Sequence, residues 1–367
     1  MITNTAERTF DVVEITNEMP RNRIGGVGTV IENLISGFEA TGTRALWFLV
    51  DHGYRRFEVD EILARYPSVA VGTHEDVRRF HAPVAHLHSY NVNPRLVHAL
   101  AGWTIVFTVH SLLVEEERSN DLSGAVRWQE ELLAACDAVV LVSEAELARY
   151  RAIGYDSLNP RVAVVHNGVR TPDGYRAPRG KVTLGFSGRL VPRKHPEYVQ
   201  MILRERGFEG CRTLIAGKGF STYARDLVGR LGIDGRVRYL GWCGGPRLEA
   251  FYDAVDVVVL PSIYEPFGLA ALEAAARGVP VVCTRVDGLV EVLGEHAFYA
   301  EGSTYAAFHA AIGRWLEADD ASLAALAAGA SARHRERFTD VAMARAYLDL
   351  FEAASRDMSA IEVHATT

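Results

Sequence analysis

The chain has 367 residues, 49% of them hydrophobic and 23% charged, the composition of a globular protein long enough for two domains. Its net charge of −7 argues against nucleic acid as a partner and provides no attraction to an anionic membrane surface. The sequence holds no apolar run of about 18 residues, and its first residues lack the apolar region of a signal peptide. We therefore expect a cytoplasmic protein without stable membrane association.

The spacing of the cysteines indicates whether the protein contains disulfide bonds or a zinc site. Four cysteines stand far apart in the chain, at Cys136, Cys211, Cys243 and Cys283, and no C-x-x-C pair occurs. This spacing is typical of reduced thiols rather than of a disulfide or zinc framework. The sequence therefore predicts a protein that works without a metal ion.

The first predicted strand, residues 10–15, leads to a glycine-rich loop. The loop contains Gly25, Gly26 and Gly28 and precedes an amphipathic helix that reaches Phe38. Glycines between a strand and a helix allow the backbone to approach a ligand closely. The loop lacks the G-x-G-x-x-G fingerprint of dinucleotide sites, so a tight packing turn is the alternative.

Two later strands of the first half end in histidines. Residues 84–91 and 104–110 are predicted strands, and His88 and His110 should lie near their carboxyl ends. In open α/β sheets ligands gather at the carboxyl ends of the strands, so both histidines are candidate site residues. Glu115, Glu116 and Glu117 come soon after His110, and a solvated helix start is the alternative to a role in binding.

The second half repeats the alternation of strand and helix after a Pro/Gly-rich stretch at residues 171–180, which we interpret as a linker. A predicted strand at residues 182–187 is followed by Gly188, Arg189 and Lys194. An arginine fork and a lysine five residues apart suit a diphosphate, although cations solvated before a helix are the alternative. Two further strands end at glycine-containing loops that include Gly217 and Trp242.

Residues 257–282 contain the most informative stretch, a strand, a loop, a helix and the next strand. Glu265 lies in the loop, and Glu273 lies eight residues further along, about 12 Å along a helix axis. Between them, the helix start at Phe267, Gly268 and Leu269 offers free N–H groups to an anion. This arrangement suits a nucleotide sugar. It fits a glycosidase poorly, because glycosidase carboxylates lie roughly 5–9.5 Å apart. Solvated glutamates on an amphipathic helix are the remaining alternative.

The E-P-F-G-L sequence with a second Glu after seven intervening residues resembles the signature of the family-4 retaining glycosyltransferases of the GT-B fold. The resemblance implies that Glu265 binds donor-sugar hydroxyls and Glu273 the ribose. It also implies that Arg189 and Lys194, in the family's G-R-x-x-x-x-K pattern, bind the leaving diphosphate. The turn at Asn167 matches the family's N-G-V-D only in part, because Arg170 replaces the aspartate.

The same resemblance implies roles for the other candidates. The loop at Gly26 would face the donor diphosphate, the loops at Gly217 and Trp242 would contact the nucleotide, and His110 would lie near the acceptor and the reacting sugar. The residues that we expect to contact the donor are Gly26, Arg189, Lys194, Gly217, Trp242, Glu265, Phe267, Gly268, Leu269 and Glu273. The catalytic candidates are His110, Arg189, Lys194 and Glu265, and the acceptor candidates are His88, His110 and Glu115.

The implied architecture is α/β, with two doubly wound, Rossmann-like domains facing across a cleft. We expect an acceptor-side domain at residues 1–172 and a nucleotide-sugar-binding domain at 173–340. A C-terminal helix would cross back onto the first domain within residues 341–367.

The implied function is a retaining hexosyltransferase that uses a nucleotide sugar, with UDP-sugars favoured, and requires no cofactor. Two alternatives stay open. A same-fold enzyme of another type, such as a pseudo-glycosyltransferase or a sugar epimerase, would use the donor site differently, and a nucleotide-sugar sensor would not be catalytic. For the acceptor, the carboxylates of Glu115, Glu116, Glu117 and Asp121 favour a small, soluble, cationic molecule such as an aminocyclitol or amino sugar. An acidic solvated loop without a role is the alternative.

Overall fold

The computed structural model describes residues 9–19, 25–50, 56–88, 95–117, 123–175, 180–231 and 234–356. Their contacts divide the chain into two compact units. The first unit comprises Met1–Arg23, Val27–Asn167 and Asp340–Thr367, and the second comprises Ile24–Gly26 and Gly168–Thr339. The divisions therefore fall after residues 167 and 339, whereas the sequence had suggested boundaries after residues 172 and 340.

The first unit is built on a seven-stranded sheet in the order β3-β2-β1-β4-β5-β6-β7. Every pair of neighbouring strands is parallel. The strands are β1 (Val12–Thr16), β2 (Ala45–Val50), β3 (Val69–Gly72), β4 (Val84–Leu87), β5 (Thr104–Val109), β6 (Ala138–Leu141) and β7 (Val162–Val164). These runs are almost wholly apolar because helices cover a parallel sheet on both faces.

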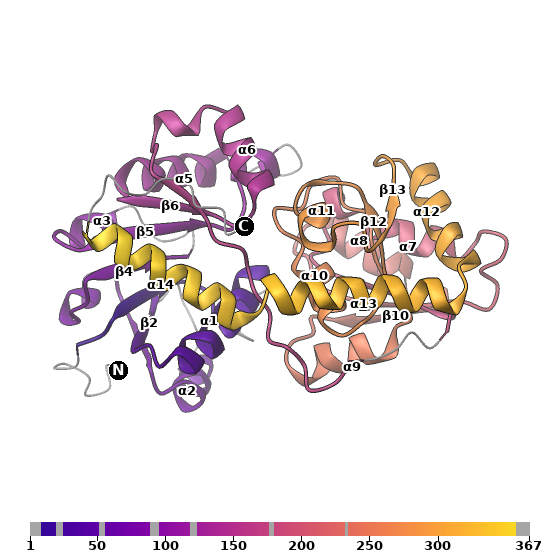
Figure 1. Cartoon of the computed structure of the whole chain (residues 1–367), viewed down its shortest axis with the longest axis horizontal. Helices are drawn as coiled ribbons and strands as arrows, with labels where there is room; N and C mark the ends of the chain where they lie inside the picture. Colours follow the sequence, from indigo (N-terminus) through magenta and orange to yellow (C-terminus); the bar gives the residue numbers. More distant parts are fainter. Residues whose placement is uncertain are drawn as a thin grey trace. The chain divides into compact units, whose positions relative to one another are not determined.

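Helices lie between most consecutive strands of the first unit, and α14 joins this unit from the C-terminal end of the described chain (Figure 1). They are α1 (Gly26–Thr41), α2 (Arg56–Arg65), α3 (Arg95–Ala99), α4 (Leu113–Glu117), α5 (Ser123–Ala135), α6 (Glu144–Ala152) and α14 (Asp340–Arg356), with short 3-10 turns η1 (Asp76–Arg79) and η2 (Tyr155–Ser157). The C-terminal helix α14 docks closely on α1. Ser36 donates a hydrogen bond to Asp340 at 2.7 Å, and a Cβ on Gly37 would lie 2.4 Å from the Asp340 carbonyl oxygen.

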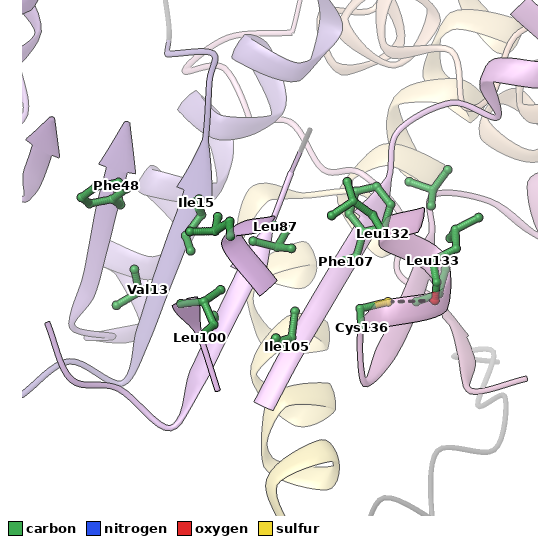
Figure 2. Close-up of a cluster of buried hydrophobic side chains, with 14 of the residues drawn as sticks. Val13, Ile15, Phe48, Leu87, Leu100, Ile105, Phe107, Leu132, Leu133 and Cys136 are labelled. Carbon is green, nitrogen blue, oxygen red and sulfur yellow. Dashed lines mark hydrogen bonds between the residues drawn. The ribbon is translucent and has the colours of Figure 1, made fainter. Parts of the chain in front are cut away.

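The two faces of the first sheet differ in chemistry. One face carries a buried apolar cluster that includes Val13, Ile15, Leu87 and Phe107 (Figure 2), and each such side chain contributes about 1.5–3 kcal/mol of burial free energy. Successive residues of a strand point to opposite faces. The intervening residues of these same strands, Glu14 and His86 among them, therefore lie on the other face, where they are also fully buried.

The second unit has a six-stranded parallel sheet in the order β10-β9-β8-β11-β12-β13. Its strands are β8 (Thr183–Ser187), β9 (Arg212–Ala216), β10 (Val237–Gly241), β11 (Val257–Leu260), β12 (Val281–Thr284) and β13 (Phe298–Ala300). Its helices are η3 (Pro192–Lys194), α7 (Glu197–Ile202), α8 (Thr222–Leu231), α9 (Pro246–Ala254), α10 (Leu269–Ala276), α11 (Asp287–Leu293), α12 (Tyr305–Glu317) and α13 (Asp320–Arg337). Phe186 and Trp315 are fully buried in its core.

Both sheets have a point at which the strand order reverses. In the first sheet β1 pairs with β2 on one side and β4 on the other, and in the second β8 pairs with β9 and β11. Such reversal points place ligand-binding loops at the carboxyl ends of the central strands. The prediction of two doubly wound, Rossmann-like domains is confirmed.

Two predictions drawn from composition can be compared with the structure. All four cysteines are buried and free of disulfide bonds. In the part of the chain that the structure describes, the helices are too short or too polar to cross a bilayer.

Candidate functional site

In the second unit, the loops that follow β8 and β9 are held together by glycines. Gly188 and Gly217 have φ angles of 153° and 159°. A Cβ on Gly217 would lie 1.9 Å from the Gly188 carbonyl oxygen, so the two backbones touch. Gly217 is thus required by packing, and this contact fixes the position of the loop that carries Arg189.

Lys194 and Glu265 form an ion pair between the loop after β8 and the loop after β11. The Lys194 Nζ lies 2.9 and 3.1 Å from the two carboxylate oxygens of Glu265. The two side chains are only 10% and 12% exposed. Ser262 donates a further hydrogen bond to Glu265 at 3.1 Å. The structure therefore joins two residues to which the sequence had assigned separate ligand groups.

Burial and the pair's own charges set the ionisation of both groups. Burial lowers the pKa of Lys194, and the attraction of Glu265 only partly offsets this effect. Burial by itself would raise the pKa of Glu265, but the nearby cations Lys194 and Arg193 outweigh it and hold that pKa below its ordinary value. Glu265 is thus a carboxylate that keeps its negative charge inside the protein.

Arg193 contacts the loop between β11 and α10 that carries Glu265. Its side chain is buried, its Nη1 donates to the Tyr264 carbonyl at 2.8 Å, and its guanidinium lies 5.3 Å from the centre of the Tyr264 ring. Its own carbonyl accepts a hydrogen bond from Ile263 at 2.8 Å. Arg193 therefore holds the loop that carries Glu265, whereas Arg189 is partly exposed at the end of β8.

The start of α10 is shaped by a close contact with α11. Gly268 caps the helix in the left-handed region, with φ 99°. A Cβ on Gly288 would lie 2.4 Å from the Phe267 Cα, and the Gly288 N–H donates to the Glu265 carbonyl at 3.2 Å. The Phe267 ring is buried against Phe338, so this residue can offer a ligand only its backbone.

Glu273 lies on α10 and is also buried. The Tyr252 hydroxyl donates to its carboxylate at 2.6 Å, and the Arg277 guanidinium lies 5.2 Å from the Tyr252 ring centre. Burial, and secondarily the negative charge of Glu273, raise the pKa of Tyr252 well above its usual range. Since Glu265 and Glu273 are both held inside the unit, the alternative of two solvated glutamates is wrong.

The remaining donor-side candidates lie at strand ends. Trp242 follows β10 and covers Gly244, whose Cβ would lie 2.6 Å from the indole ring. Arg189, Gly217, Trp242 and Glu265 thus follow β8, β9, β10 and β11, the four adjoining parallel strands of one sheet. The carboxyl ends of parallel strands share one edge, so these residues are gathered there. Leu269 is the first residue of α10, and Gly26 is the first residue of α1.

In the first unit, His88 and His110 belong to a hydrogen-bonded network. The His88 Nδ1 lies 3.2 Å from the His110 Nε2, and the His88 Nε2 lies 2.5 Å from the Glu14 carboxylate. His88 is fully buried, and both of its ring nitrogens are engaged. The predicted contact of His88 with an acceptor is not tested by the structure, in which the ring is buried and both of its nitrogens have protein partners. His110 retains partial exposure.

The ionisation of the network follows from burial and from its one carboxylate. Burial by itself would raise the pKa of Glu14, but the adjacent imidazoles of His86 and His88 lower it to about 2. Burial, together with the neighbouring His86, lowers the pKa of His88 to about 4. Burial also holds the pKa of His110 well below its usual range. At neutral pH His88 and His110 are thus uncharged.

Glu14, His86 and His88 also bring three potential metal ligands together. Their chemistry suits a transition metal, but such an ion lies about 2.0–2.2 Å from each ligand. The Glu14 oxygen is only 2.5 and 2.8 Å from the two imidazole nitrogens, too close for an ion to bind between them. As it stands, the cluster is a hydrogen-bonded network.

The acidic run after His110 is engaged within the unit. The Glu115 side chain is 8% exposed, and its carboxylate lies 3.6 Å from Arg149. Glu116 is buried and accepts a hydrogen bond from Ser111 at 2.8 Å. Both carboxylates thus have partners in the fold, and their expected role in attracting an acceptor stays a prediction. The Glu117 side chain and Asp121 lie outside the described residues.

Sequence reasoning missed Glu14 and Tyr347. Tyr347 lies on α14 and its hydroxyl is 3.0 Å from that of Thr108, so it extends the histidine network. Glu14 could have been noticed, since a charged residue inside an apolar central strand must have a partner. No local pattern identifies Tyr347.

The fold is shared with solved glycosyltransferase structures of the GT-B class. Sucrose-phosphate synthase from Thermosynechococcus elongatus has a TM-score of 0.74 and 20% identity, covering 93% of this chain and 99% of that one. HepE from Anabaena, solved with UDP and glucose, has a TM-score of 0.72 and 18% identity, covering 94% of this chain and all of that one. The chain therefore has the GT-B fold, as predicted.

Curated relatives are glycosyltransferases by name. The D-inositol 3-phosphate glycosyltransferases of Streptomyces scabiei and Streptomyces avermitilis are 30% and 31% identical over 288 and 285 residues, 71% of this chain in each case. An uncharacterized glycosyltransferase of Methanocaldococcus jannaschii is 42% identical over 110 residues, 29% of this chain. The chain spans 63%, 60% and 28% of these three relatives, less than two thirds of each.

Two family models match adjoining parts of the sequence. A model described as Glycosyltransferase Family 4 matches residues 24–172, and one described as Glycosyl transferases group 1 matches residues 171–333. The chain belongs to glycosyltransferase family 4.

Proposed function

We propose that this glycosyltransferase transfers a sugar from a nucleoside diphosphate, with UDP-sugars favoured, to a small acceptor, with retention of anomeric configuration and without a metal ion. The observation that carries the proposal is the buried pair of Lys194 and Glu265 beside the start of α10. Lys194 is a cation suited to a diphosphate, and Glu265 is a carboxylate suited to sugar hydroxyls. The two side chains lie in direct contact. The UDP and glucose bound in the structurally similar HepE support this choice of donor.

Lys194 can serve both ligand groups at once. An ammonium group has three N–H donors, and two of them are directed to the oxygens of Glu265. The third N–H remains for a phosphate oxygen. Glu265 in turn has acceptor sites left for sugar hydroxyls, because an ionised carboxylate offers about four lone-pair positions. The pair would thus set the distance between the diphosphate and the sugar.

The proposed reaction breaks the bond between the sugar C1 and the diphosphate oxygen. A bond from the acceptor forms to C1 on the same face, and the acceptor's proton passes to the departing phosphate. Negative charge develops on the diphosphate, where Arg189, Lys194 and the free N–H groups at the start of α10 would stabilise it. Glu273, held by Tyr252, would accept hydrogen bonds from the ribose.

The acceptor that we propose is a small polyol of the cyclitol or sugar class. The relatives named for D-inositol 3-phosphate support this class. The cationic acceptor suggested by the sequence depended on four carboxylates, of which Glu115 and Glu116 have partners within the first unit. The names of the relatives support the acceptor class, and assays with acceptors of different charge test its charge.

The first experiment is a screen of nucleotide sugars for thermal stabilisation, followed by transfer assays with neutral, amine-bearing and phosphorylated cyclitols. We expect a UDP-sugar to raise the melting temperature most and to be consumed with formation of a glycoside whose anomeric proton shows retention. Activity should persist in a chelator. Inversion at C1, or loss of activity in the chelator, would contradict the mechanism, and donor binding without any turnover would favour a sensor.

The two glutamates can be separated by calorimetry. Glu273→Gln should weaken the binding of free UDP, since its proposed partner is the ribose. Glu265→Gln should leave the binding of UDP nearly intact and weaken that of UDP-glucose. The reverse pattern would show that the two roles are exchanged or incorrect.

A further inference from the structure

The polar face of the first sheet carries two short chains of polar groups that meet at one carboxylate. Glu14 on β1, His86 on β4, His88 after β4 and Thr108 on β5 are each no more than 1% exposed. They lie on one face because Glu14 pairs in register with His86, and His86 with Val106, two residues before Thr108. Glu14 is the charged acceptor at which these two chains meet.

Glu14 determines where His88 carries its proton. An ionised carboxylate only accepts hydrogen bonds, so the His88 Nε2, 2.5 Å from the Glu14 oxygen, must bear hydrogen. A neutral imidazole has a single N–H. The Nδ1 of His88 is therefore a bare lone pair that can only accept.

The same constraint passes on to His110. Its Nε2 lies 3.2 Å from the His88 Nδ1, and since this nitrogen of His88 only accepts, His110 must be the donor. His110 then carries its one proton on Nε2, and its own Nδ1 is the bare nitrogen. Among the described residues, no hydrogen bond reaches this Nδ1, and the residue is partly exposed.

A second branch runs through His86. The His86 Nδ1 lies 2.8 Å from the same Glu14 oxygen, a short approach that is poorly aligned for a hydrogen bond. The His86 Nε2 lies 2.7 Å from the Thr108 hydroxyl, which is 3.0 Å from the Tyr347 hydroxyl. This branch ends at Tyr347 on α14, and among the described residues no hydrogen bond joins Tyr347 to His110, so Tyr347 offers a matched control.

We propose that Glu14 is a positioning residue that, through His88, fixes the tautomer of His110 so that its Nδ1 accepts a hydrogen bond from a substrate hydroxyl. This role for the substrate rests on the proposed function, whereas the tautomer itself does not. His110 would recognise a sugar hydroxyl as an acceptor, and its proton would stay directed into the protein. A substrate with a hydrogen-bond acceptor in place of that hydroxyl should bind more weakly, because its lone pair would face the lone pair of the His110 Nδ1.

The direct test is the imidazole ¹⁵N spectrum of the whole protein, because protonated and bare ring nitrogens resonate far apart. The His88 and His110 signals are assigned from spectra of His88→Asn and His110→Asn. We expect a single tautomer for both residues, with hydrogen on Nε2 and a bare Nδ1. A proton on the Nδ1 of His110 in the wild-type protein would overturn the proposal, whatever the variants show.

Two variants test whether Glu14 sets the tautomer of His110. Glu14→Gln replaces the acceptor-only carboxylate with a group that also donates, so His110 should show a mixture of tautomers. Tyr347→Phe removes only the hydroxyl at the end of the other branch, so the His110 signals should stay as in the wild type. An unchanged His110 tautomer in Glu14→Gln, or an equal change in Tyr347→Phe, would overturn the role of Glu14.

Measurements of the Kd for UDP and for UDP-glucose distinguish a failure of this inference from a failure of the proposed function. In Glu14→Gln, the Kd for UDP-glucose should rise about tenfold, the equivalent of about 1.4 kcal/mol, while the Kd for free UDP should not change. An unchanged Kd for UDP-glucose, with the tautomer altered, would refute the contact between His110 and the sugar. If the wild-type protein binds neither UDP nor UDP-glucose, the proposed donor fails, and the spectrum still decides the tautomer.

Discussion

At the scale of single residues, the site depends on groups that lose their solvation when the chain folds. Lys194 and Glu265 are nearly buried and satisfy one another, and Glu14 is fully buried among imidazoles. Removing one member of such a pair leaves a charge without a partner in a place that water does not reach. The cost is typically about 3–5 kcal/mol, far more than for an exposed ion pair.

Lys194→Ala should therefore reduce both activity and stability. If Lys194 stabilises the departing diphosphate as proposed, its loss should lower turnover roughly 10²–10³-fold. Because Glu265 would stay buried and unpaired, the melting temperature should fall by several degrees. Arg189→Ala, at a partly exposed position, should lower turnover to a similar degree with a smaller loss of stability. Steady-state kinetics and thermal unfolding check both, and wild-type turnover in the two variants would refute the diphosphate assignment.

The histidine network should make stability depend on pH. The folded-state pKa of His88 is about 4 against an ordinary 6.5, so between these values the unfolded chain binds the extra proton and stability falls as pH falls. Glu14, with a folded-state pKa of about 2 against 4.5, acts in the same direction below pH 4.5.

The comparison that isolates His88 is denaturant unfolding of wild type and His88→Asn between pH 7 and pH 4. The wild type should lose stability more steeply, by up to about 1.4 kcal/mol per pH unit for the one proton concerned. Parallel stability curves for the two proteins would show that His88 is not held neutral in the folded state.

At the scale of elements, short loops at the ends of parallel strands are joined by backbone contacts that only glycine permits. The contact of Gly217 with Gly188 ties the loop after β9 to the loop after β8, and that of Gly288 with Phe267 ties α11 to the start of α10. Arg189 and Glu265 are carried on loops held in this way. The precision of the site thus comes from close packing of main chain.

Gly217→Ala should disrupt the site, because its Cβ would fall 1.9 Å from a carbonyl oxygen and its φ is 159°. We expect a loss of more than about 2 kcal/mol in unfolding free energy and weaker UDP binding. Gly229→Ala is the control, since Gly229 lies within α8 with nothing within 4 Å of its Cβ. That change should stabilise the protein by about 0.5–1 kcal/mol. Equal effects from the two substitutions would contradict this account.

At the scale of the whole molecule, each unit has its own sheet, its own core and its own group of candidate residues. The donor-side residues that surround Lys194 and Glu265 belong to the second unit, whereas Glu14, His88 and His110 belong to the first. The proposed chemical roles are thus divided between two units that belong to one chain.

This division predicts the pattern of amide hydrogen exchange. Free UDP should protect the segments at residues 188–194 and 265–269, in the second unit, and leave residues 84–88 and 104–110 unchanged. UDP-glucose should extend protection to the segment that ends at His110, since the sugar is what His110 is proposed to contact. Protection of the first unit by UDP alone would contradict the assignment of the nucleotide to the second unit.

The sequence by itself determined the fold class, and it supplied the candidate site residues of the second unit. Short apolar runs alternating with helical segments predict parallel sheets, and the spacings of Arg189 with Lys194 and of Glu265 with Glu273 are local patterns. Local patterns suffice here because a strand end, a loop and the following helix are set by neighbouring residues.

Only the tertiary structure decided which side chains meet. Lys194 and Glu265 are 71 residues apart, and Glu14 and His88 are 74 apart. Their contacts depend on the order and register of the strands, which composition and periodicity do not specify. The same holds for Arg149 beside Glu115 and for Tyr347 beside Thr108. A residue's charge and hydrogen-bonding capacity are local properties, but its burial and its partners arise only when distant strands and helices pack together.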